Sequence, residues 1–209
     1  DLFWFLGDFT PVIPSAYVFP QTPVVRGFQS DPSLFRVSSV SLGGILEPNM
    51  KLPYRIFDID FSSVLTLDRY AALQTAVNPP PPPFYYQPTR TFRRLDPKRH
   101  QGLLELMNVK YVVIPADPAL RLTGKVDPFA GLERYRLVYA QEVKVYENRG
   151  VLPRAFLVDR AVVVDSPAAA LAGITRADFD PRAAVLLEDP ASPRLPAPGP
   201  ALDSPGSAT

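Results

Sequence analysis

Apolar and polar positions along the chain form short segments that predict a mixture of strands and helices. Residues 34–40 and 53–59 alternate apolar and polar side chains, which is typical of strands with one buried face. Residues 111–114 form a continuous apolar run, which indicates a central strand covered on both faces. Further strands are predicted over residues 136–140, 143–146, 155–158, 161–164 and 184–187, the first two joined as a hairpin and the last one buried.

Helices are predicted over residues 67–76, 96–108 and 166–173, because each segment has an Asp or Ser near its start that can cap a helix. In the second and third segments, a proline follows at the first helical position. Asn108 and Gly173 can end these two helices, since both residue types tolerate a left-handed backbone. The elements together predict an α/β or α+β fold, with one mixed β-sheet, a few short helices and Pro-rich connectors.

The distribution of proline suggests how the chain is organised. Proline occupies 26 of 209 positions, about twice the usual frequency of roughly 5%. We expect residues 1–33 to form an extended N-terminal segment, and residues 34–188 a single α/β domain with a Pro-rich connector at 79–95. Residues 189–209, rich in Pro, Ala and Ser, are expected to be a disordered tail. The five prolines at 79–83 favour a polyproline II spacer, or alternatively a ligand for an aromatic-lined groove.

Composition narrows the classes of function. The 22 basic and 21 acidic residues give a net charge of +1, which argues against a nucleic-acid partner. Without cysteine, the chain has no disulfide, no Cys-ligated zinc and no thiol nucleophile. The single histidine, His100, excludes a site with several His ligands, and we expect it in a solvated basic turn. The sequence therefore predicts no metal site, no cofactor and no catalytic residue.

The N-terminal segment is unusually apolar for its length. Trp4 lies among Leu and Phe residues at positions 2–6, but about 20 apolar residues are needed to span a bilayer. Four prolines interrupt the uncharged residues 9–25, so no membrane-spanning helix is predicted there. Residues 2–6 either form a first core segment or follow a membrane helix directly, with the indole of Trp4 at the interface.

Two groups of polar residues are candidate binding sites. Asp58 and Asp60, two positions apart near a predicted strand end, face the same side, where they could exchange protons or bind a cation. They could equally be two solvated carboxylates. A positive patch could bind an anionic lipid headgroup or a phosphorylated sugar carrier, or be ordinary surface. It consists of Arg93, Arg94, Lys98 and Arg99.

Five short motifs follow one another in register over residues 1–188. They are residues 19–23 with 35–37 (Phe-Pro-x-Thr-Pro and Phe-Arg-Val), Arg69-Tyr70, residues 103–113 (Leu-Leu-Glu-Leu-Met-Asn-Val-Lys-Tyr-Val-Val), residues 145–148 with 152–158 (Val-Tyr-Glu-Asn and Leu-Pro-Arg-Ala-Phe-Leu-Val), and residues 179–182 with 185–188. In these motifs the chain resembles the bacterial YfhO-like family of polytopic membrane proteins. It departs from many members at Phe61-Ser62-Ser63, where they have Gly-Tyr-Asp.

The resemblance implies a place at the extracytoplasmic face of the bacterial cell membrane. YfhO-like proteins resemble membrane glycosyltransferases that use lipid-linked sugars, and their presumed catalytic carboxylates lie outside the region matched here. The implied partners are the transmembrane portion of the parent protein and a glycan or lipid-linked sugar. The implied role is that of a non-catalytic domain that assists lipid-linked sugar transfer or positions an acceptor glycan.

The residues suggested for ligand contact are Asp58, Asp60, Arg69 and Tyr70. Two alternatives stay open, a free-standing carbohydrate-binding module and a soluble enzyme that uses Asp58 and Asp60.

Overall fold

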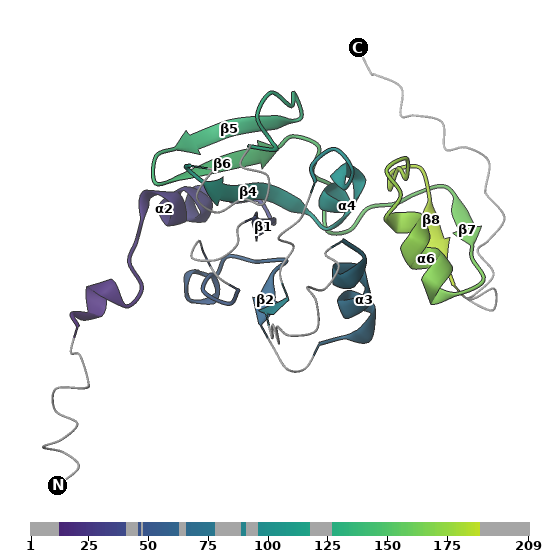
Figure 1. The fold of residues 1–209 in the computed structure, drawn as a ribbon, viewed down its shortest axis with the longest axis horizontal. Coiled ribbons are helices and arrows are strands. Elements are labelled where there is room, and N and C mark those ends of the chain that lie inside the picture. The colour runs from purple at the N-terminus through teal and green to yellow at the C-terminus, as the bar shows by residue number, and fades with distance from the viewer. Residues whose placement is uncertain are drawn as a thin grey trace, which may run out of the picture.

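The computed structural model, which describes residues 13–40, 46, 48–62, 66–77, 89–90, 96–117 and 127–188, has an α+β fold (Figure 1). Its main sheet is mixed, as the sequence predicts, and it has four strands. The strand order is β1 (Arg36–Ser39), β4 (Val109–Pro115), β6 (Val143–Asn148) and β5 (Tyr135–Ala140). β1 runs parallel to β4, while β4, β6 and β5 are antiparallel neighbours.

β4 is the central strand that the apolar run at 111–114 predicts. Val112, Val113 and Ile114 have no exposed surface, because β4 has a strand on each side and a layer on each face. The predicted β5–β6 hairpin is confirmed as well, with its turn at Gln141 and Glu142.

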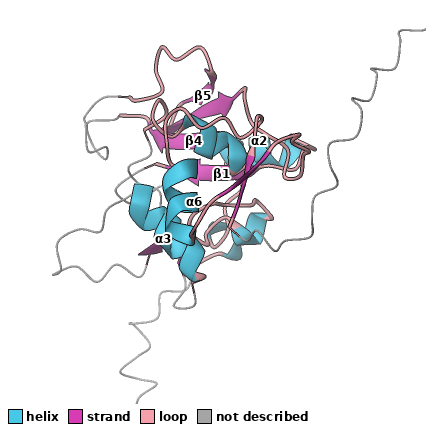
Figure 2. Ribbon diagram, turned by 90° about the vertical axis from the view of Figure 1, so that its right-hand side faces the viewer, coloured by secondary structure: helices cyan, strands magenta, loops and turns pink. Residues whose placement is uncertain are grey.

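Each face of the main sheet has its own helical layer. Helix α2 (Pro23–Ser30) lies on one face, where Phe28 packs with Val37, Val113 and Val145. On the opposite face, α4 (Gln101–Leu106) and α3 (Asp68–Val77) contribute to a second cluster that includes Leu104 and Val112. Figure 2 shows β5, β4 and β1 in succession, with α2 and α3 on opposite sides of the view.

The junction between α4 and β4 follows the sequence prediction in part. Asp96 accepts hydrogen bonds from the backbone N–H groups of Lys98 and Arg99, but the chain first forms a turn and α4 begins only at Gln101. Asn108 has a φ of 59°, so the predicted left-handed residue is confirmed. This conformation redirects the chain from the helix into the central strand.

Two smaller sheets complete the fold. β2 (Phe61–Ser62) and β3 (Thr89–Arg90) are antiparallel. β7 (Ala161–Val163) and β8 (Val185–Leu187) are parallel, and β8 contacts α6 (Pro167–Ile174). We call residues 161–187 the C-terminal unit (Figure 1, right). Ser166 caps α6 by accepting a hydrogen bond from the N–H of Ala169 (3.2 Å).

The prediction of a strand over 53–59 is wrong. Residues 52–54 form a short 3-10 helix, η2 (Leu52–Tyr54), and Arg55 is left-handed with a φ of 58°. Only Asp58 forms an isolated parallel bridge with β1, opposite Val37. The segment is instead a loop in which Ile56 and Ile59 are buried. Ile56 joins the hydrophobic cluster under α2, and Ile59 joins the cluster on the opposite face of the sheet.

The prediction of a strand over 155–158 is also wrong. These residues connect the main sheet to the C-terminal unit, and Leu157 is 99% exposed. β8, predicted to be buried, is exposed or half-buried because its small sheet has few layers over it. α6 continues one residue beyond Gly173, and Asp68 lies in the first turn of α3 rather than before it.

The expectation of an extended N-terminal segment is wrong for residues 15–17 and 23–30. The first range is a 3-10 helix, η1 (Ser15–Tyr17), and the second is α2. Thr22 caps α2 by accepting a hydrogen bond from Val25 (3.3 Å), and Pro23 occupies the first helical position. Val25 and Phe28 are buried in the hydrophobic core and pack the helix against the sheet.

Several expectations fall outside the described residues. They concern Trp4 and its neighbours, the prolines at 79–83, Arg93, Arg94 and the tail at 189–209. In the part that the structure describes, no helix combines the length and the apolar character that crossing a membrane requires.

Candidate functional site

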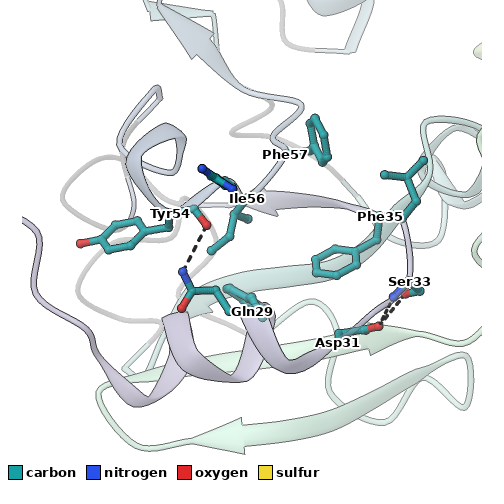
Figure 3. A pocket seen from close by; sticks show the side chains of 10 residues that line it. Gln29, Asp31, Ser33, Phe35, Tyr54, Ile56 and Phe57 are labelled. Atoms are coloured by element: carbon teal, nitrogen blue, oxygen red, sulfur yellow. Dashed lines mark hydrogen bonds between the residues drawn. The ribbon is translucent and has the colours of Figure 1, made fainter.

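A cleft of about 340 Å³ opens between the end of α2, the loop that leads to β1, and the segment around η2. Figure 3 shows the side chains that line it. They are Phe28, Gln29, Asp31, Ser33, Leu34, Phe35, Tyr54, Arg55, Ile56 and Phe57. Two stretches that are separate in the sequence, residues 28–35 and 54–57, therefore build one concave surface.

The apolar part of the cleft is rigid because it belongs to the core. Phe28, Phe35 and Ile56 are buried, and the ring of Phe35 meets the ring of Tyr111 edge to face at 5.0 Å. Phe57 differs from them, since 51% of its surface is exposed. The cleft thus has a preformed apolar floor and an accessible aromatic ring at its rim.

Asp31 is a charged group held in a fixed orientation beside this floor. Its Oδ1 accepts hydrogen bonds from the N–H and hydroxyl of Ser33, at 2.9 and 2.6 Å (Figure 3). Its Oδ2 accepts from Lys110 (2.5 Å) and from the hydroxyl of Tyr111 (2.7 Å). Desolvation alone would raise the pKa of Asp31, but these hydrogen bonds outweigh it and bring the pKa well below its ordinary value.

The cleft also carries an amide, from Gln29 on α2, and a guanidinium, from Arg55 after η2. Gln29 donates a hydrogen bond to the carbonyl oxygen of Tyr54 (3.2 Å), which ties α2 to the η2 segment (Figure 3). The hydroxyl of Tyr54 points out of the cleft and donates to Pro20 (3.0 Å). Arg55 is exposed, and among the described residues it has no ion-pair partner.

This arrangement is suited to a ligand with both apolar and hydroxyl-bearing surfaces. Its volume lies at the lower end of the range for small-molecule sites, roughly 300–1,000 Å³. A sugar ring has an apolar face of C–H groups, which can stack on Phe57, and a polar edge that can bond to Gln29 and Arg55.

The structure brings together the two carboxylates singled out from the sequence, but not in the cleft. Asp58 pairs with the buried Lys51 at 2.5 Å and accepts the N–H of Asp60 at 2.9 Å. Asp60 is 3% exposed and accepts the N–H of Ser39 (3.2 Å). Burial raises the pKa of Asp58, against the opposing charge of Lys51. Asp58 and Asp60 are therefore partnered inside the fold rather than solvated.

Of the Arg69–Tyr70 pair, only the tyrosine joins this group. Tyr70 donates a hydrogen bond to the carbonyl of Ile59, and burial, followed by the charge of Asp60, raises the pKa of its hydroxyl well above its ordinary value. Arg69 points elsewhere and pairs with Glu188 beyond β8 (2.6 Å).

The described part of the predicted positive patch does not form a site. Lys98 and Arg99 are exposed in the turn before α4. His100, expected in a solvated turn, is 8% exposed, and its Nδ1 accepts the N–H of Asp96 (3.1 Å). Burial lowers the pKa of His100, and the charge of Arg99 adds to this effect. The imidazole thus closes a local turn.

Residues from separate sequence motifs contact one another at the start of β4. Asn108 donates to the carbonyl of Leu152 (2.8 Å) and accepts from Arg154 (3.3 Å). Arg36 donates to the carbonyl of Met107 (2.9 Å), the residue before Asn108. These polar side chains fix the junction between the helix and the central strand.

A second polar group attaches the C-terminal unit. Glu105, 1% exposed on α4, accepts hydrogen bonds from Arg182 (2.5 Å) and pairs with Arg134. Arg182 also donates to the carbonyl of Gly150 (2.6 Å). Gly102 allows this close packing, because a Cβ atom there would lie 2.8 Å from the carbonyl oxygen of Phe179.

The chain matches no family model, no curated protein and no solved structure. Within the described ranges, no group of three or more His, Cys, Asp or Glu residues could hold a metal ion. A second cleft, of about 300 Å³, lies between α2 and the strands β4, β5 and β6. We take the first cleft as the candidate site because its lining combines a buried apolar floor with fixed polar groups.

Sequence reasoning did not find the cleft, since its residues come from two stretches, 28–35 and 54–57, that share no motif. Two local signals were available. Asp31-Pro32-Ser33 is a sequence that favours a side-chain-capped turn, and Phe57 is a large apolar residue directly before the charged Asp58.

Proposed function

We propose that this chain is a non-catalytic, extracytoplasmic domain of a YfhO-like membrane protein and that its cleft holds a glycan. The membrane setting comes from the motif resemblance alone. The observation that carries the binding role is the cleft, whose lining residues include the exposed Phe57 and the fixed polar groups of Gln29 and Asp31. Such a domain would position an acceptor glycan, or the sugar of a lipid-linked donor, for the membrane portion.

The alternative of a soluble enzyme that uses Asp58 and Asp60 has weaker support. A general acid or base must reach the substrate, whereas neither carboxylate lines the cleft. The hydrogen-bonding capacity of Asp58 is directed to Lys51 and to the backbone. These contacts suit a structural role.

The proposal is tested by titrating the chain with neutral tetrasaccharides of glucose, N-acetylglucosamine and mannose, followed by backbone NMR. We expect at least one of them to shift the resonances of residues 28–35 and 54–57. Phe57→Ala should weaken that binding about fivefold or more, the order of one aromatic stacking contact. Leu157→Ala is the matched control, because Leu157 is 99% exposed and lies outside the cleft.

Two results would contradict the proposal. One is the absence of shifts at the cleft with all three sugars, or equal weakening by the control. The other is transfer of sugar by the isolated chain from a polyprenyl-phosphate donor, abolished by Asp58→Asn, which would support the enzyme alternative.

A further inference from the structure

Arg154 lies beside the exposed ring of Phe57, a residue that lines the cleft. Its guanidinium stacks on that ring, 4.0 Å from the centroid, and its Nε donates to Asn108 (3.3 Å). Arg36 donates to the carbonyl of Met107 (2.9 Å), and its charge acts on Arg154. The two guanidiniums are thus held on consecutive residues just after α4.

Neither guanidinium is paired directly with a carboxylate among the described residues. In the part of the chain that the structure describes, neither Arg36 nor Arg154 forms an ion pair. Both are half-buried, and burial together with the charge of Arg36 lowers the pKa of Arg154. Two neighbouring cations without a direct ion pair repel each other, so an anion between them would reduce this repulsion.

The unused hydrogen-bond donors of the two guanidiniums also favour an anionic ligand. A guanidinium has five N–H donors, and these two make three hydrogen bonds to the protein, one from Arg36 and two from Arg154. The remaining donors match the geometry of a phosphate or carboxylate, which arginine binds through two oxygens.

We propose that Arg36 and Arg154 form an anion subsite, which binds the phosphate or carboxylate of a saccharide whose sugar ring occupies the cleft beside Phe57. The inference rests on the proposed function, because it names the class of glycan: a sugar phosphate or an acidic sugar. Phe57 connects the two parts, since it is one of the residues that line the cleft and its ring contacts the guanidinium of Arg154.

The test uses inorganic pyrophosphate, glucose 1-phosphate and glucuronate, at low ionic strength because the interaction is electrostatic. The readout on the unmodified chain is the Nε–Hε NMR signals of the arginines. We expect pyrophosphate to shift the signals of Arg36 and Arg154. Glucose 1-phosphate and glucuronate, which differ in the anionic group, should also shift cleft resonances and show which group is preferred.

Arg36→Gln should weaken binding of pyrophosphate tenfold or more. Arg160→Gln, which removes the same charge from an exposed arginine without an ion pair among the described residues, should leave it within twofold. Unshifted Arg36 and Arg154 signals, or equal weakening by the control, would overturn the anion subsite. If neutral sugars bind but pyrophosphate does not, the anion subsite is overturned and the glycan proposal stands. If pyrophosphate binds but no sugar does, the glycan proposal is overturned and the anion subsite stands.

Discussion

Among single residues, Lys51 shows how a charge that looks exposed in the sequence can belong to the interior. Its side chain is 1% exposed, and its ammonium is held by Asp58 (2.5 Å) and the carbonyl of Leu46 (2.8 Å). Burying an ammonium is costly unless it is paired. The pair therefore decides whether the η2 segment can lie against β1.

Replacing Asp58 with Asn should lower the free energy of unfolding by about 3 kcal/mol, because Lys51 would stay buried without its counter-charge. Urea unfolding followed by circular dichroism measures the change. The double variant Lys51→Met with Asp58→Asn should recover much of the loss.

Asp178→Asn is the control, since Asp178 forms an ion pair that is exposed on both sides. Its unfolding midpoint should match that of the unmodified chain. If Asp58→Asn is no more destabilising than this control, the buried pair does not have the structural role assigned to it.

Several individual residues were predictable and others were not. Asn108 could be identified from the sequence because a left-handed Asn between a helix and a strand depends on local preference. Arg55 is also left-handed, but its conformation depends on Lys51 and Ile56 being drawn into the fold. No local pattern contains that information.

At the scale of elements, Asn108 is the joint between α4 and β4, and it acts through both its backbone and its side chain. Asn108→Gly and Asn108→Ala remove the same side-chain bonds to Leu152 and Arg154. Both variants must adopt the left-handed backbone, but only the Cβ of alanine makes this conformation strained.

We therefore expect the alanine variant to be less stable than the glycine variant by about 1 kcal/mol. Thermal and urea unfolding of the two variants give this difference directly. Equal stabilities would mean that the chain changes its path at this joint, and that a φ of 59° is not required.

The elements also show why similar apolar runs have different outcomes. The run at 111–114 becomes the central strand because β1 and β6 pair with it on both sides. The run at 155–158 has comparable composition, but it forms no strand and leaves Leu157 exposed. The apolar pattern predicts that a segment can form a strand, but the strand forms only where the edge of another strand is available to pair with it.

At the scale of the whole molecule, the C-terminal unit is attached by a few polar contacts rather than by a shared core. Neither hydrophobic cluster of buried residues described for the main sheet includes a residue from 161–187. The attachment depends on Arg182, which reaches Glu105 and Gly150, and on the Arg69–Glu188 pair.

Arg182→Gln should loosen this attachment and leave the main sheet intact. Hydrogen exchange followed by mass spectrometry should show faster exchange in residues 161–187 and unchanged exchange in β4. Arg176→Gln is the control, because Arg176 pairs with Asp178 inside the same unit. Exchange that rises equally in β4, or that does not rise in the C-terminal unit, would contradict this view of the attachment.

The parallel pairing of β1 with β4 has a consequence for the order in which the domain is made. Arg36 pairs with Val109, so β1 leaves the ribosome long before its partner, whereas β5 and β6 are separated by a two-residue turn. Closing the long loop costs more chain entropy than closing the hairpin. During synthesis β1 therefore stays unpaired with β4 until β4 has been made, and we expect this pairing to form more slowly than the β5–β6 hairpin.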